Sequence, residues 1–306
     1  MHHFVPEIEE LVINWHVTEP CNFRCGYCFA AWEGATSKRE LWKDKRETGR
    51  LLSSLYSFFD PENPSSPLRE HLHWRGVRLS LAGGEPTLLG GRLTEIAGQA
   101  KSLGFRVSLI TNGSRPNVIV AAAEHLDMIG ISVDSPNQET NRTIGRVGPT
   151  GTSVSGDDAM DIVAQVRSIN PNIVVKINTV VSSANAGENL SNLILRLRPN
   201  RWKIMRVLPV LSDALIIDTN AFRAFVDRHR SFQHLMTIED NADMERSYVM
   251  VDPHGRFFQN GTGKQAYGYS RPILEIGAKV AFGDIELRPE GFAARYPKSQ
   301  DGSVAQ

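Results

Sequence analysis

The sequence has few cysteines and no excess of either charge. Its 306 residues include 3 cysteines, and 34 basic residues balance 34 acidic ones. This balance gives no overall field that attracts nucleic acid or an acidic membrane surface, so we expect neither as a partner. A hydrophobic fraction of 41% with 22% charged residues is typical of a globular chain, not of a disordered or membrane-spanning one. The first residues lack the basic and apolar parts of a secretory signal, so we expect a cytoplasmic protein.

The cysteines that are present lie close together. Cys21, Cys25 and Cys28 fall within one short segment, and the rest of the sequence has none. An odd, clustered set in a chain with no export signal excludes a disulfide framework. It indicates metal or thiol chemistry instead.

Apolar β-branched runs alternate with amphipathic stretches through the first two-thirds of the sequence. Six strands are expected at residues 11–17, 77–81, 106–110, 128–133, 173–181 and 202–207. Helices are expected at 38–58, 93–103, 116–125, 159–169 and 190–197. Repeated strand–helix units form parallel sheets through right-handed crossovers. The fold class is therefore α/β, an open (β/α)6 partial barrel whose functional loops follow the carboxyl ends of the strands.

The pattern changes near residue 218. A helix at 221–229 is followed by a hairpin, with strands at 248–251 and 257–258 around Asp252-Pro253-His254-Gly255. We interpret residues 1–306 as a single domain, with a partial barrel core at about 8–218 and a C-terminal extension at about 219–296 that packs on it. The polar residues 297–306 are expected to form a flexible tail.

The cysteines have the spacing CxxxCxxC directly after the first expected strand. Three thiolates on one loop can hold three corners of a [4Fe–4S] cluster and leave its fourth iron open. The alternative is a structural zinc site with a fourth ligand such as His16, although zinc sites generally use paired CxxC or HxxxH motifs. An open iron indicates chemistry rather than electron storage.

This spacing resembles the radical S-adenosylmethionine (SAM) superfamily. The Gly83-Gly84-Glu85-Pro86 segment follows the second expected strand and matches the GGEP motif that receives the SAM amino group in that superfamily. Tyr27 matches the aromatic position beside the adenine. The resemblance implies two cofactors, a [4Fe–4S] cluster and SAM, that together generate a 5′-deoxyadenosyl radical.

Basic residues occur inside the expected strands, where an unpaired charge is costly. Arg78, Lys176, Arg201 and Lys203 face no obvious acidic residue on a neighbouring strand. Arg201 and Lys203 share one strand face, as do Lys176 and Asn178. If these faces line the barrel, four cations converge and match the charge of a nucleoside triphosphate. Otherwise they are solvated strand ends or partners of helix carboxylates.

The order of further motifs resembles the viperin family of radical SAM enzymes, in particular its prokaryotic members, over nearly the whole chain. The matching segments are Asn14-Trp15-His16-Val17-Thr18, Thr111-Asn112-Gly113-Ser114, Gly130-Ile131-Ser132-Val133-Asp134-Ser135, Asn141-Arg142-Thr143-Ile144-Gly145-Arg146, Lys176-Ile177-Asn178, Arg201-Trp202-Lys203 and Ser247-Tyr248. The family dehydrates a ribonucleoside triphosphate to its 3′-deoxy-3′,4′-didehydro analogue, a chain terminator for viral RNA synthesis. The resemblance therefore implies this lyase activity, with CTP, UTP or GTP as substrate, and a role in antiviral (anti-phage) defence.

The same resemblance assigns roles to individual residues. Ser132 and Arg146 match the residues that hold the SAM carboxylate, and Asn112 lies near its ribose. The triphosphate would be bound by Arg78, Lys176, Arg201 and Lys203, and the rest of the nucleotide by Asn178 and Asn14. Tyr248 matches a tyrosine near the substrate ribose that donates a proton or hydrogen atom, although hairpin packing explains it equally well.

The sequence departs from animal viperin at three places. Ala82 stands before the GGEP motif where animal viperin has serine, and both the N-terminal amphipathic helix and the C-terminal tryptophan are missing. We therefore expect a monomer without membrane association. Expected partners are an electron donor such as flavodoxin or ferredoxin, and iron–sulfur assembly machinery.

Two other interpretations stay open. A radical SAM enzyme that acts on another small molecule leaves the basic residues unexplained. GTP-cyclising and peptide-maturing types need further cysteines for auxiliary clusters, and the sequence has none after Cys28. An iron–sulfur or zinc sensor needs neither the GGEP motif nor the basic strand residues.

Overall fold

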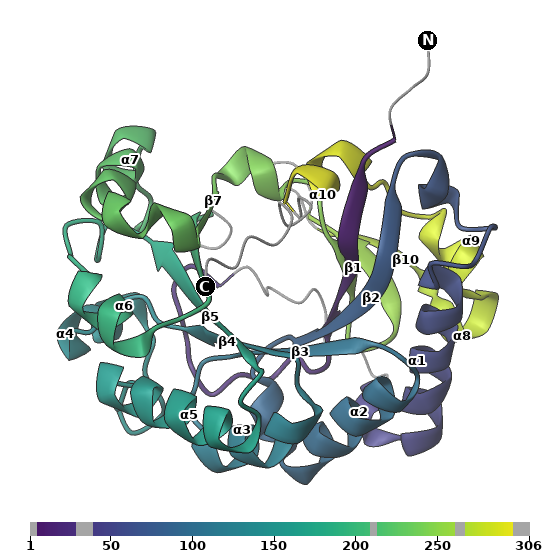
Figure 1. Cartoon of the computed structure of the whole chain (residues 1–306), viewed down its shortest axis with the longest axis horizontal. Coiled ribbons are helices and arrows are strands. Elements are labelled where there is room, and N and C mark those ends of the chain that lie inside the picture. Colours follow the sequence, from purple (N-terminus) through teal and green to yellow (C-terminus); the bar gives the residue numbers. More distant parts are fainter. Residues whose placement is uncertain (1–4, 29–38, 209–212, 261–266, 296–306) are drawn as a thin grey trace, which may run out of the picture.

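The computed structural model describes residues 5–28, 39–208, 213–260 and 267–295, which form one ten-stranded sheet with helices on its outer side (Figure 1). The strands are β1 (Glu7–His16), β2 (His73–Ala82), β3 (Arg106–Thr111), β4 (Met128–Ser132), β5 (Val174–Val181), β6 (Arg201–Arg206), β7 (Met236–Glu239), β8 (Val249–Val251), β9 (Arg256–Gln259) and β10 (Gly268–Pro272). Their order is β10-β9-β8-β1-β2-β3-β4-β5-β6-β7. Strands β1 to β6 are parallel neighbours in chain order, which confirms the predicted partial barrel.

Helices connect the parallel strands and cover the convex side of the curved sheet in Figure 1. The α-helices are α1 (Lys45–Phe59), α2 (Gly91–Ser102), α3 (Pro116–Ala122), α4 (Gln138–Ile144), α5 (Gly156–Ile169), α6 (Ser191–Leu197), α7 (Thr219–Arg228), α8 (Ile273–Ile276), α9 (Ala278–Phe282) and α10 (Pro289–Arg295). The 3-10 turns are η1 (Leu41–Lys43), η2 (Pro67–Glu70), η3 (Pro86–Leu89), η4 (Ala123–His125), η5 (Arg230–Leu235) and η6 (Asn241–Met244).

The first helix begins later than the sequence pattern predicts. Asp44 caps α1, because its carboxylate accepts hydrogen bonds from the backbone N–H groups of Arg46 at 2.9 Å and Glu47 at 3.1 Å. The preceding turn η1 belongs to a separate segment, and the predicted start at Lys38 lies outside the described residues. From Lys45 onwards the apolar side of the helix faces the sheet and buries Leu51, Leu55 and Phe59, among others.

Strand residues alternate between two environments. On β1, Leu11, Ile13 and Trp15 are completely buried under the helix layer. Val12, Asn14 and His16 instead line a cavity on the concave side. This alternation follows from the two-residue period of a strand, and it recurs on the neighbouring strands. The concave side therefore collects the polar residues of the barrel.

The C-terminal extension pairs directly with both ends of the barrel sheet. Strand β7 runs parallel to β6, whereas β8 runs parallel to β1 on the other side. The predicted hairpin is β8 and β9, which are antiparallel around a turn where Gly255 has a φ of +75°. The segment 240–248 therefore crosses the open side of the barrel. The predicted tail at 297–306 lies outside the described residues.

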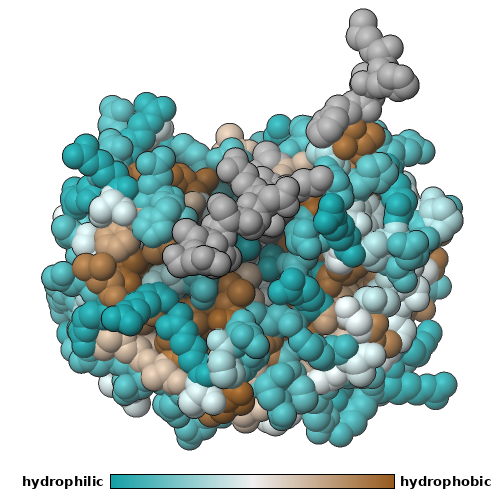
Figure 2. All heavy atoms as spheres, in the orientation of Figure 1, coloured by the Kyte–Doolittle hydropathy of each residue, from teal (hydrophilic) through white to brown (hydrophobic). Residues whose placement is uncertain are grey.

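In the parts of the chain that the structure describes, no helix combines the length and the apolar character needed to cross a membrane. Hydrophilic residues dominate the outer helices in Figure 2, and hydrophobic residues appear mainly toward the middle of that face. This distribution is consistent with a core between the helix layer and the sheet.

Candidate active site

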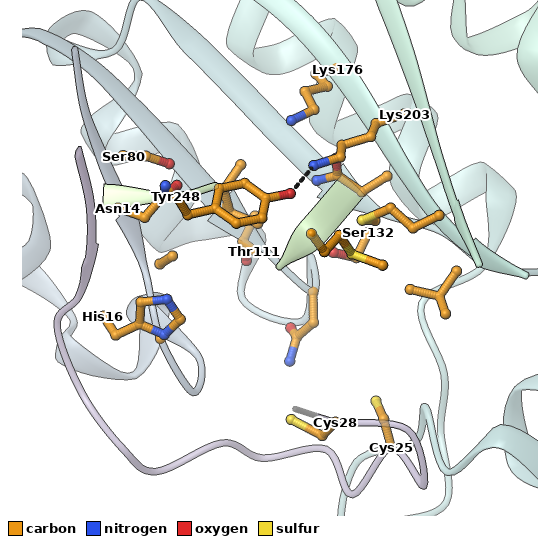
Figure 3. A pocket seen from close by; sticks show the side chains of 18 of the residues that line it. Asn14, His16, Cys25, Cys28, Ser80, Thr111, Ser132, Lys176, Lys203 and Tyr248 are labelled. Carbon is orange, nitrogen blue, oxygen red and sulfur yellow. Dashed lines mark hydrogen bonds between the residues drawn. The ribbon is translucent and has the colours of Figure 1, made fainter. Parts of the chain in front are cut away.

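A cavity of about 340 Å³ occupies the concave side of the barrel. Every candidate residue from the sequence lines it: Asn14, Cys21, Cys25, Tyr27, Cys28, Arg78, Gly83, Gly84, Glu85, Asn112, Ser132, Arg146, Lys176, Asn178, Arg201, Lys203 and Tyr248. Figure 3 shows Cys25 and Cys28 at one end and Lys176 and Lys203 at the other, with Tyr248 between them. The cavity thus joins a thiol end and a basic end.

The cysteine loop is clamped to the GGEP segment. The N–H of Gly84 donates to the carbonyl of Thr18 at 2.7 Å, and that of Glu85 donates to the carbonyl of Pro20 at 2.9 Å. A Cβ added at Gly84 would lie 2.0 Å from the Pro20 carbonyl oxygen, and one at Gly83 would lie 2.7 Å from that of Thr18. Both glycines are therefore needed for the close approach of two backbones.

The end of α4 holds the same loop from the other side. The N–H of Arg24 donates to the carbonyl of Gly145 at 3.1 Å, and that of Gly26 donates to Ile144 at 2.8 Å. Gly145 has a φ of +85° and ends the helix, as glycine commonly does. The sequence pattern did not predict α4, and its role in holding the cysteine loop was missed with it.

The three thiols suit an iron–sulfur cluster better than a single metal ion. Among the described residues, no group of three or more His, Cys, Asp or Glu side chains lies close enough together to hold one ion. A cubane binds each cysteine to a different iron and needs spaced sulfurs. Burial also raises the pKa of Cys25 to about 12, so a cationic centre is needed to hold it as thiolate.

His16 packs against the C-terminal hairpin. Its ring packs edge-on against Phe258, with centroids 5.1 Å apart, and burial lowers the pKa of His16 to about 4. Figure 3 places it apart from the labelled cysteines. This separation from Cys25 and Cys28 does not support His16 as a fourth ligand beside them.

Glu85 is buried, and its carboxylate ties its own segment to the end of β3. Oε1 accepts from the hydroxyls of Thr87 and Thr111, both at 2.6 Å, and Oε2 accepts from the backbone N–H of Asn112 at 2.7 Å. A carboxylate oxygen has about two acceptor sites, so Oε2 retains one that a ligand amino group can fill. Glu85 therefore has a structural role beside the predicted one.

Asn112 bridges the carboxyl end of β3 to the cysteine loop. Its Nδ2 donates to Oδ1 of Asn22 at 2.9 Å and lies 3.9 Å from the sulfur of Cys21. The oxygen of the same amide accepts from the N–H of Ser114 at 2.9 Å. The residue thus borders the thiol end of the cavity, where the resemblance places the SAM ribose.

A buried network joins Tyr27 to the carboxyl end of β4. The phenol of Tyr27 donates to Asp134, and Arg146 contacts both, at 3.2 Å from the phenol oxygen and 3.5 Å from the carboxylate. Arg146 also donates to the carbonyl of Ser132 at 2.6 Å. Burial and the negative charge of Asp134 raise the pKa of Tyr27 well above its usual value. Asp134 is a site residue that the sequence reasoning did not single out.

The expectation that the four cations face no acidic strand residue is wrong. Arg78 pairs with Glu10 of β1 at 3.0 Å, and Lys203 pairs with Glu239 of β7 at 2.7 Å. Strand β1 begins at Glu7, four residues before the predicted start, and this places Glu10 on the same face as Val12, whose neighbour on β2 is Arg78. An acidic residue within an expected strand could have indicated a partner for a cation on the neighbouring strand.

The basic end still carries an excess of positive charge. Lys176 pairs in register with Arg201, and Asn178 pairs with Lys203 on the same two strands. Burial lowers the pKa of Lys176 well below its usual value, and the nearby Lys203 and Arg78 lower it further. Like charges that repel one another inside a cavity favour the binding of an anion.

Three remaining polar residues surround the middle of the cavity. Nδ2 of Asn14 lies 3.5 Å from the carbonyl of Val249, and Oδ1 of the buried Asn178 has no hydrogen-bond partner within the described part of the chain. Tyr248 accepts a hydrogen bond from Lys203 at 2.8 Å, drawn in Figure 3, and donates one to Glu239 at 2.5 Å. An unsatisfied buried amide oxygen is costly, so Asn178 is suited to a ligand that donates to it.

Comparisons with known proteins agree with this site. A sequence profile of the radical SAM superfamily matches residues 15–183. The S-adenosylmethionine-dependent nucleotide dehydratase of Pseudoalteromonas ulvae is 41% identical over 94% of both chains. The protein of the same name from Psychrobacter lutiphocae is 42% identical, over 95% of this chain and 96% of its own.

Solved structures support the fold. The structure of anSMEcpe with bound AdoMet superimposes with a TM-score of 0.58 over 90% of this chain and 77% of its own, at 14% identity. The profile match and the full-length similarity to the dehydratases confirm the family that the motifs indicated. The chain belongs to the radical SAM superfamily and, within it, to the S-adenosylmethionine-dependent nucleotide dehydratases of the viperin family.

Proposed function

We propose that this protein dehydrates a ribonucleoside triphosphate, CTP, UTP or GTP, to its 3′-deoxy-3′,4′-didehydro analogue. The observation that carries the proposal is the cavity itself, with thiols at one end and Arg78, Lys176, Arg201 and Lys203 at the other. A triphosphate carries close to four negative charges, which these side chains can neutralise. The names of the related nucleotide dehydratases support the same reaction.

Cys21, Cys25 and Cys28 would hold a [4Fe–4S] cluster. The neighbouring residues would bind SAM: Tyr27, Gly83, Gly84, Glu85, Asn112, Ser132 and Arg146. When bound, these cofactors supply the 5′-deoxyadenosyl radical that removes a hydrogen atom from the ribose 4′ carbon. Arg146 would receive the SAM carboxylate beside Asp134, and the free acceptor site on Glu85 would receive the amino group.

The polar groups in the middle of the cavity would orient the ribose. With its triphosphate among the cations, the nucleotide would place its sugar near Asn14, Asn178 and Tyr248. Loss of the 3′ hydroxyl as water requires one proton and one electron. Tyr248 would donate the proton, and an electron donor such as flavodoxin or ferredoxin would supply the electron. The chain residues thus contribute mainly positioning and charge neutralisation.

The biological setting follows from the product. A nucleotide without a 3′ hydroxyl stops RNA synthesis, so we assign the protein to antiviral (anti-phage) defence in the cytoplasm. It would act as a monomer loaded by iron–sulfur assembly machinery. These assignments rest on the viperin resemblance.

The test is an assay with the reconstituted protein, SAM and a reductant, run separately with CTP, UTP, GTP and ATP. We expect 5′-deoxyadenosine and a dehydrated nucleotide to form together, and only with triphosphates. Equal turnover with the nucleosides would refute the triphosphate assignment and favour another small-molecule substrate. The matched control is Cys25→Ala, which should lose the brown cluster absorbance and turnover but keep part of the nucleotide binding.

A further inference from the structure

Glu239, Tyr248 and Lys203 contact one another at the basic end of the cavity. The Tyr248 hydroxyl donates to Oε2 of Glu239 at 2.5 Å and accepts from Nζ of Lys203 at 2.8 Å. The Lys203 ammonium lies 2.7 Å from Oε1 of Glu239, and Glu239 is only 3% exposed. Neither Glu239 nor its contacts follow from the sequence motifs.

These side chains come from opposite sides of the open barrel. Lys203 lies on β6 and Glu239 ends β7, whereas Tyr248 directly precedes β8, which pairs with β1. The carbonyl of Tyr248 accepts a hydrogen bond from Nε2 of Gln259 at 2.7 Å, which fixes its backbone on the β8 side. The position of the phenol hydroxyl is then set by Glu239 and Lys203 on the other side.

We propose that Glu239 is the positioning residue for Tyr248 in the dehydration reaction, an inference that rests on the proposed function. Its carboxylate accepts the phenol proton in the free protein and holds the ring across the opening, beside the expected ribose position. When Tyr248 donates this proton, the hydroxyl turns from Glu239 to the substrate. A ring that is already held in place loses little orientational freedom when the substrate binds.

Glu239 also has an opposing effect on binding. Its negative charge holds Lys203, and the incoming triphosphate must compete for the same ammonium group. The carboxylate therefore weakens nucleotide binding while it supports turnover. A residue with only a structural role has no reason to affect these two quantities in opposite directions.

The decisive variant is Glu239→Gln, which keeps the size of the side chain and removes its charge. We expect it to bind the triphosphate about three- to tenfold more tightly, measured by calorimetry with SAM but without reductant. The dehydration rate constant at saturating nucleotide should fall at least about tenfold. Glu239→Asp keeps the charge but draws it away from the hydroxyl, so it should lower the rate constant without tightening binding.

A double variant tests whether Glu239 acts through Tyr248 or contributes to the reaction independently of it. If Glu239 acts through the Tyr248 hydroxyl, Glu239→Gln in a Tyr248→Phe background should lower the rate constant no further. Asp240→Asn is the matched control, because Asp240 is the next residue and pairs with Arg206 at 2.6 Å instead. It should keep the wild-type rate.

The outcomes are distinct. If the wild-type protein forms product and the rate constant of Glu239→Gln stays within twofold of it, the positioning role is overturned. Additive losses of rate in the double variant would also overturn it. Weaker triphosphate binding by Glu239→Gln would overturn the competition for Lys203. A wild-type protein that forms no dehydrated nucleotide would instead overturn the proposed function.

Discussion

Glu10 and Glu239 balance part of the positive charge of the basic end when no ligand is bound. Each pairs with one of the cations, Arg78 and Lys203 respectively, at positions where the side chains are almost fully buried. A buried charge without a partner is strongly destabilising, so these carboxylates allow the folded protein to keep its cations. A bound triphosphate would then share or replace these partners.

Substitution of Lys203 tests the basic end at the level of one residue. Lys203→Ala should weaken triphosphate binding by about 1–3 kcal/mol, because a charge-assisted hydrogen bond is lost. Calorimetry with SAM and a triphosphate, but no reductant, measures this loss. Arg75→Ala is the control, since Arg75 is exposed on the same sheet and pairs with Glu7 at 2.8 Å outside the cavity. Unchanged affinity in Lys203→Ala would leave this lysine with only a structural role.

The lowered pKa of Lys176 predicts a dependence on pH. Its pKa is below the usual value in the free protein, and a bound anion favours the charged ammonium and raises it again. Binding should therefore take up protons. Affinity should fall as pH rises from the pKa of Lys176 in the free protein to its higher pKa in the complex. Calorimetry in buffers of different ionisation enthalpy measures this proton uptake. A pH of about 8 is chosen because the phosphates are fully ionised there and take up no protons themselves. Proton uptake that persists in Lys176→Met would assign it to another group.

The sequence motifs identified the basic residue of each ion pair in the site, but not its acidic partner. Arg78, Arg146 and Lys203 were identified as binding residues, whereas their partners Glu10, Asp134 and Glu239 were not. For Arg78 and Lys203 the reason is physical. A cation in a strand demands an explanation by itself, but its carboxylate is supplied by strand register, from Glu10 on β1 and from Glu239 on β7, and local patterns do not encode this register. Arg146 was identified through the family resemblance.

At the scale of single elements, the GGEP segment acts as a clamp between two loops. Gly84→Ala should destabilise the protein by about 1–3 kcal/mol, because the new Cβ would lie 2.0 Å from the Pro20 carbonyl oxygen, and backbone must shift. It should also lower the iron content after reconstitution, since that carbonyl directly precedes Cys21. Chemical denaturation and iron analysis measure the two effects.

Gly91→Ala is the control for this substitution. Nothing lies within 4 Å of a Cβ added at Gly91, and the residue begins α2. Alanine there should be neutral or stabilise the protein by up to about 1 kcal/mol. If Gly84→Ala and Gly91→Ala lower the stability equally, the loss at Gly84 does not come from its close approach to the Pro20 carbonyl.

The elements differ in how well the sequence predicted them. The six barrel strands were placed within a few residues, because β-branched runs between helical patterns are a strong local signal. Helix α4 was missed, since Gln138–Ile144 is short and mostly polar. The parallel pairing of β8 with β1 joins residues about 235 positions apart, and no local pattern reveals such a contact.

At the scale of the whole molecule, the extension shares the core of the barrel. Phe257 of β9 packs edge-on against Phe59 of α1, with ring centroids 6.1 Å apart, and against Phe282 of α9 at 5.3 Å. Strand β8 covers one side of β1, which would otherwise be an exposed edge. We therefore propose that the barrel core and the extension fold as one unit.

Removal of the extension tests this view. A chain that ends at residue 218 should not fold as a soluble monomer, because both β1 and β6 lose a neighbouring strand and aromatic core residues lose their partners. Size-exclusion chromatography and circular dichroism of the truncated and full-length chains compare the two. A monomeric truncated chain with a cooperative thermal transition would show that the barrel core is independent.

The crossing of the open side has a mechanical consequence. Strands β7 and β10 are the two edges of the sheet, so in the described part of the chain backbone ladders do not complete the ring. The phenol hydroxyl of Tyr248 and its two partners complete it with side chains. We expect the barrel to widen at this seam by releasing these side-chain contacts, while the strand pairs and the segment 240–248 that joins the two sides stay intact. Passage of a nucleotide as large as a triphosphate then needs no unfolding of the sheet.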